Sequence, residues 1–180
     1  FLNWVGGMGI IVLAVAALPL LGVGGMQLYK AETPGPIKDS KLTPRITETA
    51  KNLWLIYAVL TLLCTLALKL AGLSWLDAVC HAFAALSLGG FSTHDASVGH
   101  FNSPLVEMIL SGFMLLAAMN FATHFLAWRG KSLWAYLRDA EAKAMLTLVL
   151  CSILSCSLYL AWYNVYPFFT ALRHVSFNLI

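Results

Sequence analysis

Residues Ser74 to Asp95 read SWLDAVCHAFAALSLGGFSTHD, and this stretch decides the fold. Ser74 and Asp77 have the Ser-x-x-Asp spacing of a capping box, which predicts a helix start at a membrane interface. The apolar helix would end near Leu86–Ser87, so it is far shorter than the roughly 20 residues that a span needs. A polar, glycine-rich segment follows directly. The stretch therefore predicts a re-entrant helix and loop that dip into a membrane.

The composition of the whole chain supports a membrane protein. The 180 residues are 60% hydrophobic and only 11% charged, with a mean hydropathy of +0.80. Soluble domains carry roughly 25% charged residues, and disordered chains carry more still. The net charge of +3 is too small for a nucleic-acid-binding surface. These figures exclude a soluble domain, a disordered chain and a nucleic-acid partner.

Four segments are long and apolar enough to be predicted as spans. They are Trp4–Met26, Leu53–Leu73, Pro104–Trp128 and Ala144–Val165. Two shorter apolar stretches, Trp75–Leu88 and Phe168–Ile180, follow the second and fourth spans and are predicted to be re-entrant. The chain begins without a basic region, so we expect no signal peptide. Because both ends fall in apolar runs, we expect them to be cuts in a longer protein.

The basic residues predict the orientation in the membrane. Nine of the 11 Lys and Arg residues lie either in the loop before the second span or in the loop before the fourth. Residues 72–103 contain none. By the positive-inside rule, the two basic loops are cytoplasmic and residues 72–103 face outward. Pro34, Pro36 and Pro44 break up the first loop, for which we expect a short interfacial helix.

The chemistry of the dip favours a cation. Non-helical backbone at membrane depth is tolerated where it lines a watery cavity or is buried in protein. A helix whose carboxyl end points inward places about half a negative charge there. Glycine permits a positive φ, so successive carbonyls can turn to one side, and a ring of carbonyls can replace the hydration shell of K⁺. The residues alone thus predict a cation-conducting pore loop.

The pattern repeats with a shift of 93 residues. Under this shift Trp75, Ala78, His81 and Leu86 fall on Phe168, Ala171, His174 and Leu179. The preceding spans also align, with Leu53 on Leu146. The chain is therefore interpreted as the end of one helix–loop–helix unit, a complete second unit and the beginning of a third.

Several segments of the sequence resemble a known family. The segment from Leu88 to Ser97 is similar to the second pore loop of the TrkH family, the membrane subunits of bacterial Trk potassium uptake systems within the Trk/Ktr/HKT superfamily. The glycine-containing segments around Gly6–Gly9 and Gly24–Lys30 also resemble that family, and Ala171–Asn178 resembles its third pore helix. The resemblance covers essentially the whole chain.

The resemblance implies an all-α integral membrane protein of repeated helix–pore-loop–helix units, similar in plan to potassium channels, of which this chain is a fragment of a four-unit pore. It also implies a multi-pass protein of the bacterial inner membrane, a homodimer in contact with lipids, and a cytoplasmic TrkA-like nucleotide-binding ring as partner. The implied divisions are 1–26 (second helix of unit one), 27–51 (cytoplasmic connector), 52–128 (unit two: helix 52–73, pore helix 74–87, filter 87–92, helix 104–128), 129–143 (connector) and 144–180 (first helix and pore helix of unit three).

Carried over to this sequence, the resemblance places a K⁺ filter in the strand Ser87–Ser92. The six residues are Ser87, Leu88, Gly89, Gly90, Phe91 and Ser92. K⁺ would bind through Leu88, Gly89 and Gly90, with Gly90 as the key filter glycine. Asp95 would raise the local cation concentration at the outer mouth. The transported K⁺ is the only ligand expected; no organic cofactor and no enzymatic activity are implied.

Other interpretations of the sequence compete with this one. Among potassium transporters, the chain could instead be a subunit of a Ktr-type Na⁺-dependent transporter. A different class of function, a membrane-embedded metal or haem protein, is suggested by His81, His94, Asp95 and His100, although their spacing matches no common ligand set. The four cysteines lie in apolar helices without a Cys-x-x-Cys spacing, so we expect buried thiols and no disulfide. Arg173, in the last apolar stretch, has no role assigned from the sequence.

Overall fold

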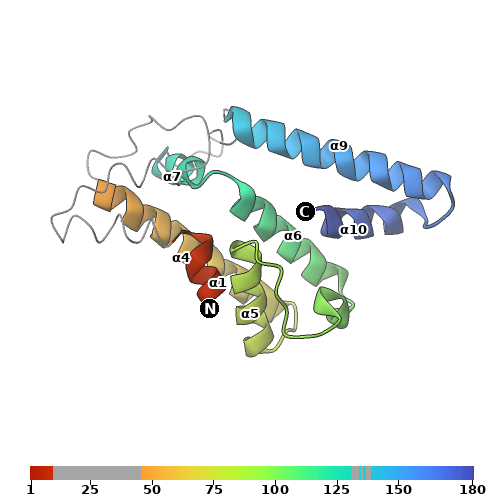
Figure 1. The fold of residues 1–180 in the computed structure, drawn as a ribbon, viewed down its shortest axis with the longest axis horizontal. Coiled ribbons are helices and arrows are strands. Elements are labelled where there is room, and N and C mark those ends of the chain that lie inside the picture. Colours follow the sequence, from red (N-terminus) through yellow and green to blue (C-terminus); the bar gives the residue numbers. More distant parts are fainter. Residues whose placement is uncertain (10–45, 131–133, 135, 137–138) are drawn as a thin grey trace.

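The computed structural model describes residues 1–9, 46–130, 134, 136 and 139–180 (Figure 1). Helices alone make up the regular structure of these residues, as the sequence predicts. The elements are α1 (Leu2–Gly7), α4 (Ile46–Leu70), α5 (Trp75–Leu86), the 3-10 helix η2 (Ser97–Phe101), α6 (Pro104–Ala118), α7 (Phe121–Gly130), α9 (Ala140–Trp162) and α10 (Phe168–Leu179). The rest of the predicted first span and most of connector 27–51 lie outside the described residues.

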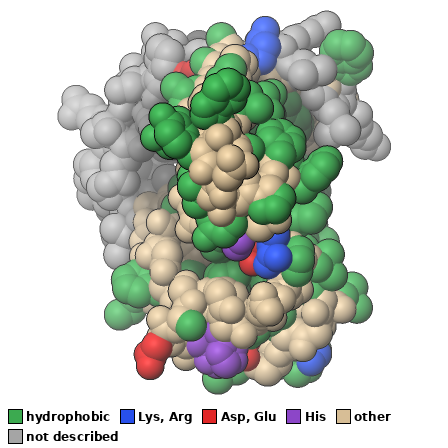
Figure 2. All heavy atoms as spheres, turned by 90° about the vertical axis from the view of Figure 1, so that its right-hand side faces the viewer, with side chains coloured by type: hydrophobic (Ala, Val, Ile, Leu, Met, Phe, Trp, Pro, Cys, Tyr) green, Lys and Arg blue, Asp and Glu red, His purple; other side chains and the backbone are tan. Residues whose placement is uncertain are grey.

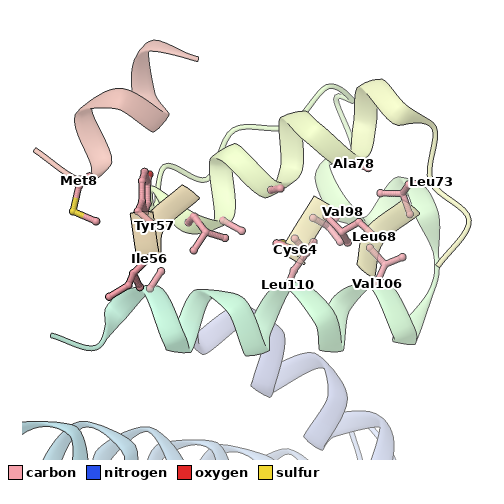
Figure 3. Close-up of a cluster of buried hydrophobic side chains, with 14 of the residues drawn as sticks. Met8, Ile56, Tyr57, Cys64, Leu68, Leu73, Ala78, Val98, Val106 and Leu110 are labelled. Atoms are coloured by element: carbon pink, nitrogen blue, oxygen red, sulfur yellow. The ribbon is translucent and has the colours of Figure 1, made fainter. Parts of the chain in front are cut away.

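Helices α4, α5 and α6 pack against one another and form the core (Figure 3). Helix α4 supplies Tyr57, Cys64 and Leu68, all fully buried, and α6 supplies Val106 and Leu110. Helix α5 faces them largely with alanines. Small side chains let a membrane helix approach its neighbours closely. The short helix is therefore held inside the unit rather than on its surface.

The helices that the sequence predicts around the dip are confirmed. Helix α4 begins earlier than the predicted second span, at Ile46, and ends three residues before its predicted end, at Leu70. Residues 46–52, the predicted end of the connector and the residue after it, therefore continue directly into the span. Among the described helices, α4 and α9 are each long and apolar enough to cross a membrane. Helices α6 and α7 add a third crossing if the bent pair is counted as one span.

The third span differs from the continuous helix predicted over 104–128. Helix α6 ends at Ala118, Met119 has extended backbone, and the chain bends by 98° before 123–130. Polar side chains stabilise the break. The His124 Nε2 donates a hydrogen bond of 2.8 Å to the carbonyl of Leu116, and the Thr123 hydroxyl hydrogen-bonds to Asp139. The carbonyl of Leu116 also accepts a hydrogen bond of 3.2 Å from the Met119 backbone N–H, so the His124 side chain adds a second donor at the end of α6.

The predicted repeat is visible in the helix boundaries. A shift of 93 residues carries the bounds of α5, Trp75–Leu86, onto those of α10, Phe168–Leu179. Ala78 and its counterpart Ala171 are both completely buried. Helices α9 and α10 pack as a hairpin, and α10 also lies against α6 (Figure 1). The second hairpin therefore repeats the α4–α5 hairpin and rests on the second unit.

The cysteines are all free thiols in this structure. Cys64 on α4 is buried, as expected, and Cys80 on α5 is half-buried. The expectation of buried thiols is wrong for Cys151 and Cys156, which are exposed on α9. The reason is that α9 packs mainly through α10 and leaves most of its apolar surface uncovered. Small apolar side chains on such a surface suit contact with lipid tails.

Candidate functional site: the loop 87–92 and its supports

The helix that leads into the predicted filter begins at an N-cap formed by Ser74. The Ser74 hydroxyl accepts a hydrogen bond of 3.1 Å from the Asp77 backbone N–H and donates one of 2.7 Å to Asp77 Oδ2. The sequence prediction of the cap is therefore confirmed. Asp77 also lies in the first turn, where a carboxylate interacts favourably with the helix dipole.

Helix α5 ends in a Schellman motif at the start of the loop. The Gly89 N–H donates to the carbonyl of Ala84 (2.9 Å), and the Leu88 N–H donates to the carbonyl of Ala85 (3.2 Å). This motif requires a left-handed residue at Leu88, whose φ is +53°. Glycine is the usual residue there, because a side chain disfavours the conformation. A leucine in this position indicates that its neighbours hold the loop in place.

The backbone of the loop reverses again two residues later. Gly90 has a φ of +67°. Leu88, Gly90 and Phe91 are exposed, whereas Ser87, Gly89 and Ser92 are half-buried. Leu88 and Gly90 both have left-handed backbone, and Gly89 lies between them. A regular helix or strand does not contain such a pair of reversals. The loop is therefore an irregular, partly open backbone at the carboxyl end of a short helix.

The first helix packs against the same loop. The Asn3 side-chain amide donates a hydrogen bond of 2.6 Å to Ser87 Oγ. A Cβ added at Gly89 would collide with the side chain of Asn3, and one added at Gly7 would lie 2.6 Å from Ser87 Cα. Both glycines thus allow a close approach of two chain segments.

A histidine within α5 holds the far end of the loop. His81 is 2% exposed, and its Nδ1 lies 2.8 Å from the Asp77 carbonyl oxygen, which can only accept. Its Nε2 is therefore the acceptor for the Ser92 hydroxyl at 2.9 Å. The Ser92 oxygen in turn accepts from the His94 backbone N–H at 3.2 Å. His81 thus ties the end of the loop to the helix that precedes it.

Asp77 holds the segment that follows the loop. The Thr93 hydroxyl donates a hydrogen bond of 2.6 Å to Asp77 Oδ1, and His94 Nε2 lies 3.2 Å from the same oxygen. The hydroxyls of Thr93 and Ser74 lower the pKa of the Asp77 carboxyl, because they stabilise its charged form. Asp77 therefore caps α5 and also anchors the outer segment, a second role that the sequence does not reveal.

The predicted outer-mouth residues lie beyond these anchors. Asp95, which the sequence analysis places at the outer mouth, is exposed. The rings of His94 and His100 stack with their centroids 3.8 Å apart, and Phe101 packs against both edge to face. Within the described part of the chain, no three His, Cys, Asp or Glu side chains are grouped so that they could hold a metal ion. The histidines instead pack with aromatic rings.

Sequence reasoning missed the role of His81, although a signal was present. His81 recurs as His174 under the shift of 93 residues, at the same place in the second short helix. A polar residue that recurs on an otherwise apolar helix indicates a shared contact. The partner, Ser92, lies 11 residues away and is brought near only by the turn at Leu88–Gly90.

We predict that His81→Phe and Ser92→Ala each weaken the support of the loop. Each removes one partner of a buried hydrogen bond, a change that destabilises by about 1–3 kcal/mol. Because both remove the bond between His81 and Ser92, the double variant should lose less stability than the sum of the two single losses. The apparent melting temperature of the four proteins in detergent checks this. Additive losses would show that the two side chains act independently.

Comparison with known proteins decides the family. The profile of a family described as TrkH, a cation transport protein, matches residues 1–176. The chain belongs to the TrkH family. It is 52% identical over 179 residues to the Trk system potassium uptake protein TrkH of Halomonas elongata, which covers 99% of this chain. It is 54% identical over 165 residues, or 92% of this chain, to the Trk system potassium uptake protein TrkH of Escherichia coli K12.

A solved TrkH structure has the same fold. The crystal structure of the potassium transporter TrkH from Vibrio parahaemolyticus matches 98% of this chain with a TM-score of 0.78 and 43% sequence identity. The chain spans little more than a third of its relatives: 37% of the Halomonas protein, 34% of the Escherichia coli protein and 35% of the Vibrio chain. With its apolar helices, TrkH family membership makes it a membrane protein.

Proposed function

We propose that these residues form a pore-lining part of a potassium uptake protein, with loop 87–92 as one element of its ion filter. The observation that carries the proposal is the paired left-handed backbone at Leu88 and Gly90, directly after the carboxyl end of α5. Such a backbone can present carbonyl oxygens of Leu88, Gly89 and Gly90 to one side. The negative end of the helix dipole favours a cation at the same place.

Three features support K⁺ as the ion. Carbonyl oxygens suit a large, weakly hydrated monovalent cation whose water shell they replace. The outer end of the loop is rich in hydroxyls and carries the exposed carboxylate of Asp95, which raises the local concentration of cations. The relatives are also named as potassium uptake proteins.

The wider assembly follows from the same proposal. The basic loops before α4 and α9 face the cytoplasm of a bacterium, and the protein crosses the inner membrane several times. Four units of the α4–α5–α6 kind surround one pore, and two copies of the transporter associate. A nucleotide-binding ring of the TrkA type contacts the cytoplasmic side, where Arg129 and Lys143 supply positive charge.

Uptake by a deficient host tests the function. We predict that a transporter of the relatives' length, carrying these 180 residues, restores growth of a K⁺-uptake-deficient bacterium at low K⁺ and takes up Rb⁺ as a tracer. A vector without insert gives the baseline. Absence of uptake, while immunoblots show the protein in the membrane, would contradict the proposal. Uptake that occurs only when Na⁺ is present would favour the Ktr-type mechanism.

A further inference from the structure

An ion pair joins two units of the fold. On α10, Arg173 donates two hydrogen bonds of 2.7 Å, from Nε to Glu107 Oε2 and from a terminal nitrogen to Oε1. The residues are 66 positions apart. The Glu107 side chain is only 12% exposed and that of Arg173 is 32% exposed. Parallel, two-point contact between a guanidinium and a carboxylate fixes the relative position and rotation of its partners.

The ion pair between Arg173 and Glu107 lies among hydrophobic side chains. On the face of the molecule shown in Figure 2, charged side chains are few among hydrophobic and uncharged ones. Glu107 lies in the first turn of α6, three residues after Pro104, where the helix dipole also favours a carboxylate. Charged residues within membrane segments are costly and generally have a specific partner. Here that partner is supplied by a different hairpin.

The ion pair has no counterpart in the α4–α5 hairpin. Under the shift of 93 residues Arg173 corresponds to position 80 (173 − 93 = 80), which is the uncharged Cys80. The guanidinium therefore does not serve the internal packing that the two short helices share. It belongs to the boundary between the units.

The boundary connects two short helices of the same kind. Glu107 stands on α6, which packs directly against α5, the helix that carries loop 87–92. Arg173 stands on α10, the repeat counterpart of α5, which otherwise packs against α9 and α6. A displacement of α10 along or around its axis would break at least one of the two hydrogen bonds. The pair thus links the position of one short helix to that of the next.

We propose that Arg173 is a positioning residue: through Glu107 it sets the depth and rotation of α10 relative to the second unit, and thereby the alignment of two successive filter elements. This proposal rests on the proposed function, because it treats α5 and α10 as pore helices. An error in alignment would alter the match between the carbonyl oxygens and the ion. It should therefore change ion preference and not only the amount of folded protein.

Substitutions of Arg173 and Glu107 test the proposal in a transporter that has the full length of the relatives. We expect Arg173→Gln to raise the KM for Rb⁺ by about threefold or more and to strengthen inhibition by Na⁺, a change of roughly 0.7 kcal/mol or more. Arg173→Lys keeps the charge but loses the two-point contact, so it should recover only part of the preference. The exchange Glu107→Arg with Arg173→Glu should recover more than either single change.

A matched control removes one positive charge without crossing between units. Within the described part of the chain, the hydrogen bond of Lys69, at the end of α4, to the Leu73 carbonyl (3.1 Å) and its contact with the ring of Trp75 both lie within its own hairpin. Lys69→Gln should leave KM and Na⁺ inhibition unchanged. If Arg173→Gln does not reach the membrane, the Arg173→Lys variant and the exchange carry the test.

The outcomes separate this proposal from the proposed function. If the Arg173 variants lower the amount of protein but leave KM and Na⁺ inhibition as in the parent, the positioning role is overturned. If Gly90→Ser changes ion preference in the same assay, the filter assignment stands regardless. If neither Gly90→Ser nor the Arg173 variants alter ion preference, the assignment of loop 87–92 to the filter is overturned together with the positioning role of Arg173.

Discussion

Gly90→Ser should leave the transporter in the membrane but weaken its preference for K⁺ over Na⁺ by about tenfold. Gly90 has a φ of +67°, a conformation that disfavours a residue with a side chain by about 1–2 kcal/mol. Each 1.4 kcal/mol corresponds to a factor of ten in an equilibrium constant. An added Cβ at Gly90 would meet no atom of the described chain within 4 Å, so packing should be preserved. The strain acts on the loop, and therefore on ion binding.

Rb⁺ uptake with and without excess Na⁺ measures the effect. Gly112→Ser is the matched control, because it makes the same chemical change on α6, where an added Cβ also meets no atom within 4 Å and φ is not positive. The control should retain the ion preference of the parent. An unchanged preference in Gly90→Ser, together with normal uptake, would falsify the assignment of Gly90 to the filter.

The sequence predicts those parts of this site that depend on neighbours along the chain. The cap formed by Ser74 and Asp77, the end of α5 at Leu86 and the glycine that turns the loop are all local patterns. Hydropathy and charge likewise predict α4 and α9, because burial in lipid depends on a long apolar run. The apolar stretch predicted over Phe168–Ile180 begins where α10 begins and ends one residue beyond it.

The parts that the sequence does not predict depend on contacts between distant segments. Leu88 adopts the left-handed conformation of a helix terminus, although a leucine gives no signal for it. The third span breaks after Ala118, where the sequence remains apolar, because His124 and Thr123 fold back to satisfy polar groups. The contact of Arg173 with Glu107 joins residues 66 positions apart. No periodicity in the sequence encodes such a pair.

The opposite effects of alanine at two adjacent glycines form the second major prediction. Gly7 and Gly6 both lie in α1, yet their surroundings differ. A Cβ at Gly7 would lie 2.5 Å from Ser87 Cβ, 2.6 Å from Ser87 Cα and 2.7 Å from the Tyr57 hydroxyl. A Cβ at Gly6 would meet no described atom within 4 Å. The two variants therefore make the same change, with and without a collision.

The groups near Gly7 have little room to move. Tyr57 is completely buried, and its hydroxyl donates a hydrogen bond of 2.9 Å to the Trp4 carbonyl. The Ser87 hydroxyl donates to the Phe83 carbonyl at 2.7 Å, and its backbone N–H binds the same oxygen at the end of α5. Relief of the collision must therefore shift α1 or the first residue of loop 87–92.

Gly7→Ala should destabilise the protein by about 1–3 kcal/mol, the usual effect of adding volume to a packed site. Gly6→Ala should be neutral or stabilising by up to about 1 kcal/mol, because alanine favours a helix over glycine. Melting temperatures of the purified transporter variants in one detergent compare the two. Since Ser87 begins the loop, Gly7→Ala should also lower Rb⁺ uptake per molecule. Equal melting temperatures for the two variants would show that α1 does not press on the loop as described, and that its close approach does not hold Ser87 in place.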